Sequence, residues 1–222
     1  LTLVLKLKET NNTLASLVTG NLKTVAIRVP SHSTARALIK EFGHPIAAPS
    51  ANISGRISPT RVTDVLFNMD GKISALIRGD DCSIGLESTI ISFFNNEPML
   101  LRPGGISIED IEEKLGRSIS KLTKDSQRQS IIIAPGMIDS HYAPKCKLKL
   151  NETVPKIGEL FLGFGHMPKD SIGLNLSQNG NIEEAATNFF AALTDIDQMA
   201  KLMKINTVSV APIPNKGLGL AI

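Results

Sequence analysis

The chain has 222 residues, of which 42% are hydrophobic and 20% are charged, a composition typical of globular domains. Its formal net charge is only +3, and it has one tyrosine and no tryptophan, so the composition does not favour a dedicated nucleic-acid-binding surface. No apolar run is long enough to predict a transmembrane helix. Cys82 and Cys146 stand far apart, which indicates free thiols in a reducing cytoplasm, and the four histidines lack a spacing that predicts a metal site.

The first part of the chain alternates strand-like and helix-like segments. The pattern predicts strands at residues 1–8, 24–30, 45–51, 73–80, 86–94 and 98–105. It predicts helices at residues 31–43, 58–71 and 107–116. We expect Ser31 or Ser33 to cap the first helix. Ser58 and Ser107 should cap the other two, because a serine hydroxyl accepts a hydrogen bond from an unpaired helix N–H. This mixture predicts an α/β or α+β sheet domain over residues 1–120.

A linker and a second domain follow. Residues 121–146 begin with a polar, unpatterned stretch, which indicates a linker. Residues 147–222 are predicted to form a smaller domain, which we expect to be incomplete at its C-terminal end. Within it the pattern predicts strands at residues 158–165, 171–177 and 207–214 and a long helix at residues 181–203. Strand–helix–strand order favours a parallel βαβ arrangement.

The stretch AAPSANISGRISPT, residues 47–60, is unusually rich in hydroxyl groups. Hydroxyls and backbone N–H groups around a glycine, before a helix, can form an anion site. The same residue types also build ordinary capped turns, and composition alone leaves both interpretations open. The stretch lacks the GxxxxGK[ST] pattern of a P-loop.

Several polar residues interrupt apolar strands. Arg28 and Arg102 each suit either a structural ion pair or bidentate contact with a carboxylate or phosphate. Ser88 can hold a polar ligand, but no His or Asp is spaced to make it a triad nucleophile. Tyr142, in the linker, is the sole tyrosine and suits packing of the linker on a domain.

Together these segments resemble one family. LTLVLK, VAIRVP, AAPSANISGRISPT, GLESTII and LLRPGGIS follow in the order and spacing of the YrdC-like domain of threonylcarbamoyl-AMP synthases. APGMIDSHYAPK, EEAATNFFAAL and PIPNKGLGLAI resemble the longer, two-domain form, so the resemblance covers nearly the whole chain. It implies an α/β fold: a twisted mixed sheet with helices and a positively charged cavity, then a small Rossmann-like domain. The linker is implied to cover that cavity.

The resemblance also implies an activity. Members of this family convert L-threonine, bicarbonate and ATP into threonylcarbamoyl-AMP and pyrophosphate. Mg²⁺ would enter with ATP, and no residue would act as a covalent nucleophile. The adenylate feeds downstream transferase proteins that make threonylcarbamoyladenosine in tRNA. The implied location is the cytoplasm, without a membrane partner.

Site residues are implied position by position. Contacts with ATP are expected from Thr24, Ser50, Ser58, Arg102 and Tyr142. Contacts with threonine are expected from Arg28, from Ser88 and from the backbone of Ala48.

The chain departs from the family at its ends. Family members carry a basic KxR-type segment before LTLVLK and continue beyond GLGLAI, so we expect an N-terminally truncated synthase with little activity by itself. Two alternatives remain: a non-catalytic YrdC-like module that binds nucleotide or, weakly, RNA, and an inactive fragment.

Overall fold

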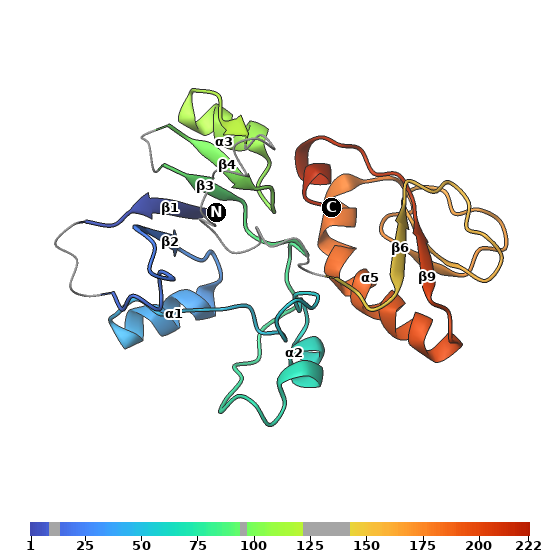
Figure 1. Cartoon of the computed structure of the whole chain (residues 1–222), viewed down its shortest axis with the longest axis horizontal. Helices are drawn as coiled ribbons and strands as arrows, with labels where there is room; N and C mark the ends of the chain where they lie inside the picture. Colours follow the sequence, from blue (N-terminus) through green and yellow to red (C-terminus); the bar gives the residue numbers. More distant parts are fainter. Residues whose placement is uncertain (9–13, 94–96, 122–142) are drawn as a thin grey trace. The chain divides into compact units, whose positions relative to one another are not determined.

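The computed structural model describes residues 1–8, 14–93, 97–121 and 143–222 (Figure 1). The chain divides into two compact units, and both are discontinuous in sequence. The first, which we call the mixed-sheet unit, consists of Leu1–Pro49 and Ser88–Asp139. The second, which we call the parallel-sheet unit, consists of Ser50–Glu87 and Ser140–Ile222.

The mixed-sheet unit is built on five strands. They are β1 (Thr2–Lys6), β2 (Thr24–Arg28), β3 (Ile90–Ser92), β4 (Met99–Arg102) and β5 (Ser120–Lys121). Their order in the sheet is β2-β1-β3-β4-β5. The pairs β1–β2 and β3–β4 are antiparallel, whereas β1–β3 and β4–β5 are parallel. Val4 and Ile90 are buried at its centre, with Leu101 packed against them. The predicted mixed sheet is confirmed.

The two helices α1 and α3 of this unit lie within their predicted ranges, but only one of them has its predicted cap. In α3 (Ile108–Leu115) the Ser107 hydroxyl accepts a hydrogen bond from Asp110 N at 3.1 Å, as predicted. In α1 (Ser33–Phe42) the cap is His32, whose Nδ1 accepts from Ala35 N at 3.4 Å. The prediction of a serine cap on α1 is therefore wrong, because the imidazole nitrogen fills the same acceptor position.

Two predicted strands are absent from the described structure. Residues 45–51 form no strand, and every residue from 41 to 51 is exposed. Pro45 and Pro49 supply no N–H to a sheet ladder, which accounts for this difference. Residues 73–80 also form no strand, and Ile77 in this run is 61% exposed. A short apolar run without alternation does not by itself specify a strand.

The parallel-sheet unit contains four parallel strands and a long helix. The strands are β6 (Lys147–Leu150), β7 (Leu160–Gly163), β8 (Gly173–Asn175) and β9 (Thr207–Val210), in the order β6-β9-β7-β8. The helix α5 (Ile182–Met203) connects β8 to β9, which confirms the predicted parallel βαβ arrangement. A short 3-10 helix, η1 (Gly217–Leu220), lies near the C-terminal end of the sequence.

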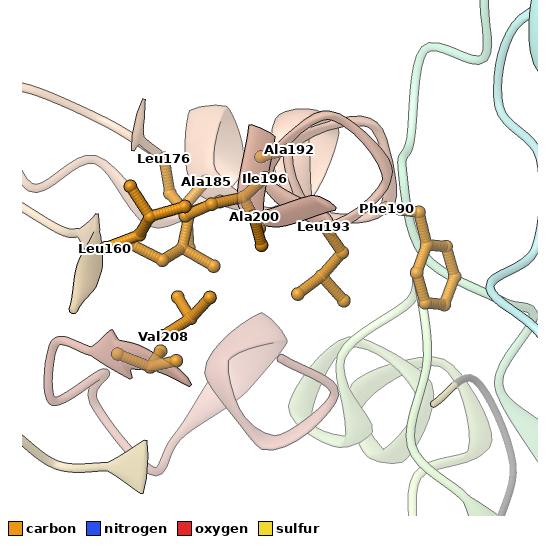
Figure 2. Packing of buried hydrophobic residues seen from close by; sticks show 11 residues of the cluster. Leu160, Leu176, Ala185, Phe190, Ala192, Leu193, Ile196, Ala200 and Val208 are labelled. Atoms are coloured by element: carbon orange, nitrogen blue, oxygen red, sulfur yellow. The ribbon is translucent and has the colours of Figure 1, made fainter. Parts of the chain in front are cut away.

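The core of this unit lies between the strands and α5. Figure 2 shows the strand residues Leu160 and Val208 facing apolar side chains of the helix. Nearly all of this surface is removed from water: Leu160, Leu162 and Ile196 are each 0% exposed. Burial of apolar side chains on both elements holds the helix on the sheet.

The segment 50–87 belongs to the parallel-sheet unit and carries α2 (Val62–Met69). The N-cap of this helix is Arg61, three residues after the predicted cap Ser58. The prediction that Ser58 caps the helix is wrong. The Ser58 hydroxyl instead donates a hydrogen bond to Glu87 Oε1 at 2.6 Å.

A charged group lies beside the parallel sheet. Glu159 accepts hydrogen bonds from Lys149 Nζ and, at 2.6 Å, from the Ser209 hydroxyl. Lys149 and Ser209 are paired neighbours on β6 and β9, so the strand register brings both donors to one carboxylate. The hydrogen bonds from Lys149 and then Ser209 lower the pKa of Glu159 to about 2.

We expect Leu162→Ala to lower the free energy of unfolding by about 2–5 kcal/mol, because a fully buried leucine leaves a cavity when truncated. Urea unfolding followed by circular dichroism measures this change. Leu202→Ala is the control, since Leu202 is 83% exposed on α5, and it should change stability by less than about 1 kcal/mol. Equal losses in the two variants would contradict the described core.

The Glu159 carboxylate predicts a dependence of stability on acid pH. Its folded-state pKa of about 2 lies below the ordinary value of 4.5, so its ionised form stabilises the fold above about pH 4.5. That contribution is lost as the pH falls from about 4.5 towards 2. The stability gap between the wild type and Glu159→Gln should therefore be largest at neutral pH and shrink across this window. A gap that stays constant down to pH 2 would refute the assignment.

Candidate functional site

Strand pairing aligns Arg28 and Arg102, which lie on two different strands of the mixed-sheet unit, along one line across the sheet. Thr2 on β1 pairs with Arg28 on β2 and with Ile90 on β3, and Ile90 pairs with Arg102 on β4. The register shifts after Ile90, so that Leu101 is an extra residue in β4. This bulge places Arg102, rather than Leu101, opposite Ile90.

Both arginines contact Ser88. Arg28 Nη2 donates to the Ser88 hydroxyl at 2.7 Å, and Arg28 Nε donates to the Thr2 hydroxyl at 2.9 Å. Arg102 Nη2 donates to the Ser88 carbonyl at 2.8 Å and to its hydroxyl at 3.1 Å. Arg102 Nε adds a bond to the same carbonyl at 3.1 Å. We call Thr2, Arg28, Ser88 and Arg102 the serine–arginine cluster.

The lone pairs and the hydrogen of the Ser88 hydroxyl determine which group donates in its contact with Thr2. The hydroxyls of Thr2 and Ser88 lie 2.7 Å apart, and either atom has the chemistry to donate. A hydroxyl has two lone pairs and one hydrogen. The two guanidinium groups occupy both lone pairs of the Ser88 hydroxyl, so its hydrogen points to Thr2.

The cluster concentrates positive charge beside a half-buried hydroxyl. Arg28 is exposed, Arg102 is partly buried, and Thr2 is only 4% exposed. The contacts described above use hydroxyl and carbonyl oxygens, which hold the guanidinium groups in place without carrying a full negative charge. Planar guanidinium groups match carboxylate and phosphate oxygens, so the arrangement suits an anionic ligand.

Thr89 holds the strand next to the cluster in place. Its side chain is 1% exposed, and its hydroxyl donates to Ile106 O at 2.6 Å while accepting from Ile106 N at 3.1 Å. This reciprocal pair ties the start of β3 to the chain that follows β4. The segments carrying Ser88 and Arg102 are thereby joined a second time.

The remaining predicted site residues are distributed differently. Thr24 is buried at the start of β2, and Ala48 is exposed; the described hydrogen bonds of the serine–arginine cluster include neither. Ser50 and Ser58 belong to the parallel-sheet unit, where Ser50 is exposed and Ser58 is 6% exposed. Tyr142 lies outside the described residues.

Sequence reasoning did not select two residues that the structure brings forward. Thr2 reads as an ordinary strand residue, and its role depends on pairing with distant strands. Asn52 closes the turn of the hydroxyl-rich stretch, because its Nδ2 donates to Ile53 O at 3.0 Å and Arg56 O at 2.9 Å. Its Oδ1 and the Thr60 hydroxyl are buried without a hydrogen-bond partner in the described part of the chain. The sequence signal that could have identified Asn52 is its position two residues after Ser50.

Among the described residues, the other reactive groups do not gather into a second centre. Burial raises the pKa of both thiols, that of Cys146 to about 11, so they stay protonated at neutral pH. Within residues 1–8, 14–93, 97–121 and 143–222, no three His, Cys, Asp or Glu side chains are grouped to hold a metal ion. Among the helices of these same ranges, none has the length and apolar character to cross a bilayer.

Two protein-family models match the chain. One, described as "Telomere recombination", matches residues 1–104. The other, described as "Threonylcarbamoyl-AMP synthase, C-terminal domain", matches residues 106–222.

Curated relatives named threonylcarbamoyl-AMP synthase are similar over the same length. Those of Bacillus subtilis and Pyrococcus abyssi are each 36% identical over 239 aligned residues, which cover 100% of this chain and 67% of the relative. That of Schizosaccharomyces pombe is 34% identical and covers 96% of this chain and 59% of the relative. The chain thus spans about two thirds or less of the length of these relatives.

Two solved structures are similar in fold to this chain over nearly its whole length. The crystal structure of P. abyssi Sua5 complexed with L-threonine superposes with a TM-score of 0.83 at 34% identity, covering 99% of this chain and 67% of that one. A double variant of the same archaeal protein gives a TM-score of 0.80 at 32% identity, covering 99% and 66%.

The shared hydrogen bond between Thr2 and Ser88 predicts coupled stabilities. We expect Thr2→Val and Ser88→Ala each to lower the free energy of unfolding by about 1 kcal/mol. The double variant should lose less than the sum, by about 0.5–1 kcal/mol, because both changes remove the same contact. Thr19→Ala, which removes a hydroxyl bonded to Ser16 O, is the control and should add to Ser88→Ala. Additivity of Thr2→Val with Ser88→Ala in urea unfolding would refute the contact.

Proposed function

The chain belongs to the threonylcarbamoyl-AMP synthase family, and we propose that it carries the substrate-binding residues of that enzyme. The reaction is the formation of threonylcarbamoyl-AMP and pyrophosphate from L-threonine, bicarbonate and ATP. The observation that carries this proposal is the convergence of Arg28 and Arg102 on the Ser88 hydroxyl. Such a cluster suits a small anionic substrate next to a polyphosphate.

The threonine side of the site is assigned to Arg28, Ser88 and the backbone of Ala48. Arg28 is exposed, and its guanidinium group can pair with the threonine carboxylate in the fork geometry that carboxylates favour. The Ser88 hydroxyl already accepts from Arg28 at 2.7 Å, so a ligand oxygen reaching this guanidinium lies beside Ser88 as well. The relative from P. abyssi was crystallised with L-threonine, which supports this class of substrate.

The nucleotide side is assigned to Thr24, Ser50, Ser58, Arg102 and Tyr142. Thr24 and Ser50 supply hydroxyl groups and Arg102 a cation, the groups that bind phosphate oxygens. The one hydrogen of the Ser58 hydroxyl is donated to Glu87, so Ser58 must exchange this partner to donate to a phosphate. Arg102 ends β4, and its contacts with the Ser88 carbonyl orient the guanidinium plane. The hydroxyl-rich stretch also holds two buried polar atoms without a described partner, Asn52 Oδ1 and Thr60 Oγ1, which support binding of a polar ligand there.

The chemistry needs positioning more than a reactive side chain. Bicarbonate loses hydroxide to give CO₂, the threonine amine attacks its carbon, and the amine proton leaves to solvent. An oxygen of the resulting carbamate attacks the α-phosphorus of ATP, and the bond to the β-phosphate oxygen breaks to release pyrophosphate. Guanidinium groups hold the two anions together and stabilise the charge that builds on the phosphate oxygens. Mg²⁺ bound to the phosphates would supply further charge neutralisation.

Under this proposal, threonylcarbamoyl-AMP is the substrate of a further reaction. Threonylcarbamoyl-AMP is a mixed anhydride, and downstream transferase proteins would pass its acyl group to adenosine in tRNA. We place these steps in the cytoplasm, where ATP, bicarbonate and tRNA are available together.

Threonine-dependent pyrophosphate release from ATP, Mg²⁺ and bicarbonate tests the activity. The assay uses this chain and a hybrid in which the part of P. abyssi Sua5 without a counterpart here is joined to it. We expect release from the hybrid and threonine binding by calorimetry in the chain. If neither protein releases pyrophosphate in response to threonine, the synthase assignment is wrong. Nucleotide or RNA binding without turnover would then favour a non-catalytic module.

Arg28→Ala tests whether threonine and ATP are bound by different residues. We expect it to weaken threonine binding at least tenfold and ATP binding much less, because its guanidinium group is assigned to the threonine carboxylate. Titration calorimetry with each ligand measures both affinities. Arg36→Ala, which removes an exposed arginine of α1, should leave both unchanged. Equal loss of both affinities in Arg28→Ala would contradict the assignment.

A further inference from the structure

Arg61 links the segment 50–87 to the long helix of the parallel-sheet unit. Its Nη1 and Nη2 donate to Oδ2 and Oδ1 of Asp195 on α5 at 2.9 and 2.7 Å. Its Nε and Nη2 donate to Asp64 at 3.0 and 2.9 Å. Four of the five guanidinium N–H groups are thus engaged, and the plane of the group is held from two sides. This geometry sets position more than it adds stability, because partly exposed ion pairs contribute little.

The same segment approaches α5 closely at Gly85. The Thr187 hydroxyl on α5 donates to Ser83 O at 3.0 Å, and Phe190 N donates to Gly85 O at 3.4 Å. A Cβ atom on Gly85 would lie 2.1 Å from Thr187 O, so only glycine permits this approach. The requirement is one of space, since a methyl group would push the backbone away from the helix.

Apolar packing supports the same attachment. Ile57 packs against the core cluster that α5 shares with the sheet. Phe190, at one end of that cluster in Figure 2, is only 5% exposed. Polar and apolar contacts therefore hold the segment on one helix at several points.

The attached segment carries Ser50 and Ser58, two of the residues assigned to ATP. Glu87 accepts the hydrogen bond of the Ser58 hydroxyl at 2.6 Å, which ties the two ends of the segment together. Ser58 is therefore held at a second point within the same unit.

We propose that Asp195 is a positioning residue for ATP binding, which acts by holding Arg61 and, with it, the segment that carries Ser50 and Ser58. The inference rests on the proposed function, since it assumes that these serines face substrates. It gives the C-terminal part of the chain a role in arranging the site. Asp195 lies in the region matched by the C-terminal family model, and Arg61 in the region matched by the other.

Asp195→Asn is the main test variant, because it keeps the size of the side chain and removes the charge and one acceptor for Arg61. We expect ATP affinity at 25 °C to fall about fivefold while the urea midpoint stays nearly unchanged, which a purely structural role would not produce. Asp195→Glu, which keeps the carboxylate, should recover part of the affinity. Glu183→Gln, an exposed change on the same helix, is the matched control and should bind ATP as the wild type does.

Amide exchange supplies a readout that is independent of substrate. Cys82 N donates to Thr60 O at 2.9 Å, so its exchange with deuterium reports on the attached segment. Exchange should accelerate in Asp195→Asn and in Gly85→Ala, which separates the segment from α5 without changing charge. Glu183→Gln should exchange at the wild-type rate.

The outcomes distinguish the two proposals. A wild type that binds no ATP overturns the proposed nucleotide site, and with it a role of Asp195 in binding. A wild type that binds ATP, with Asp195→Asn binding equally well, overturns the positioning role alone. Unchanged Cys82 exchange in Asp195→Asn also overturns it, because Arg61 would then hold the segment without that carboxylate.

Discussion

The pairing of Thr2 with both Arg28 and Ile90 is the constraint on which the candidate site depends. Side chains alternate between the two faces of a sheet, so a slip of one residue in β1 would move its hydroxyl to the opposite face. The bulge at Leu101 acts in the same way on β4, because it decides which residue stands opposite Ile90. Two backbone registers thus bring positive charge from two strands to one serine.

Local signals in the sequence predicted much of the fold. The helix α5 has apolar residues at helical spacing, and Ser107 caps α3 as its position before an acidic first turn indicates. Where the prediction failed, a competing contact decided the outcome. Ser58 bonds to Glu87 instead of capping a helix, and residues 45–51 lack the N–H groups that a strand needs. Such competition depends on residues far apart in sequence.

The candidate site was predictable in its parts and not in its arrangement. Arg28, Ser88 and Arg102 were selected from sequence as polar residues in apolar surroundings, and the structure brings these three together. Their meeting depends on the bulge at Leu101 and on Thr2, a buried threonine that nothing in its neighbourhood distinguishes. Whether Ser50 and the other expected ATP contacts bind nucleotide stays a prediction.

The discontinuity of the parallel-sheet unit has a consequence for how this chain is inherited. The two family models divide the sequence near residue 105, yet the segment 50–87 shares a compact unit with α5. If one of these two parts were replaced by that of a relative, Arg61 would need a matching carboxylate on the new helix. The approach of the segment to α5 at Thr187 would likewise need a glycine at position 85. Substitutions at these contacts are therefore expected to occur in matched sets.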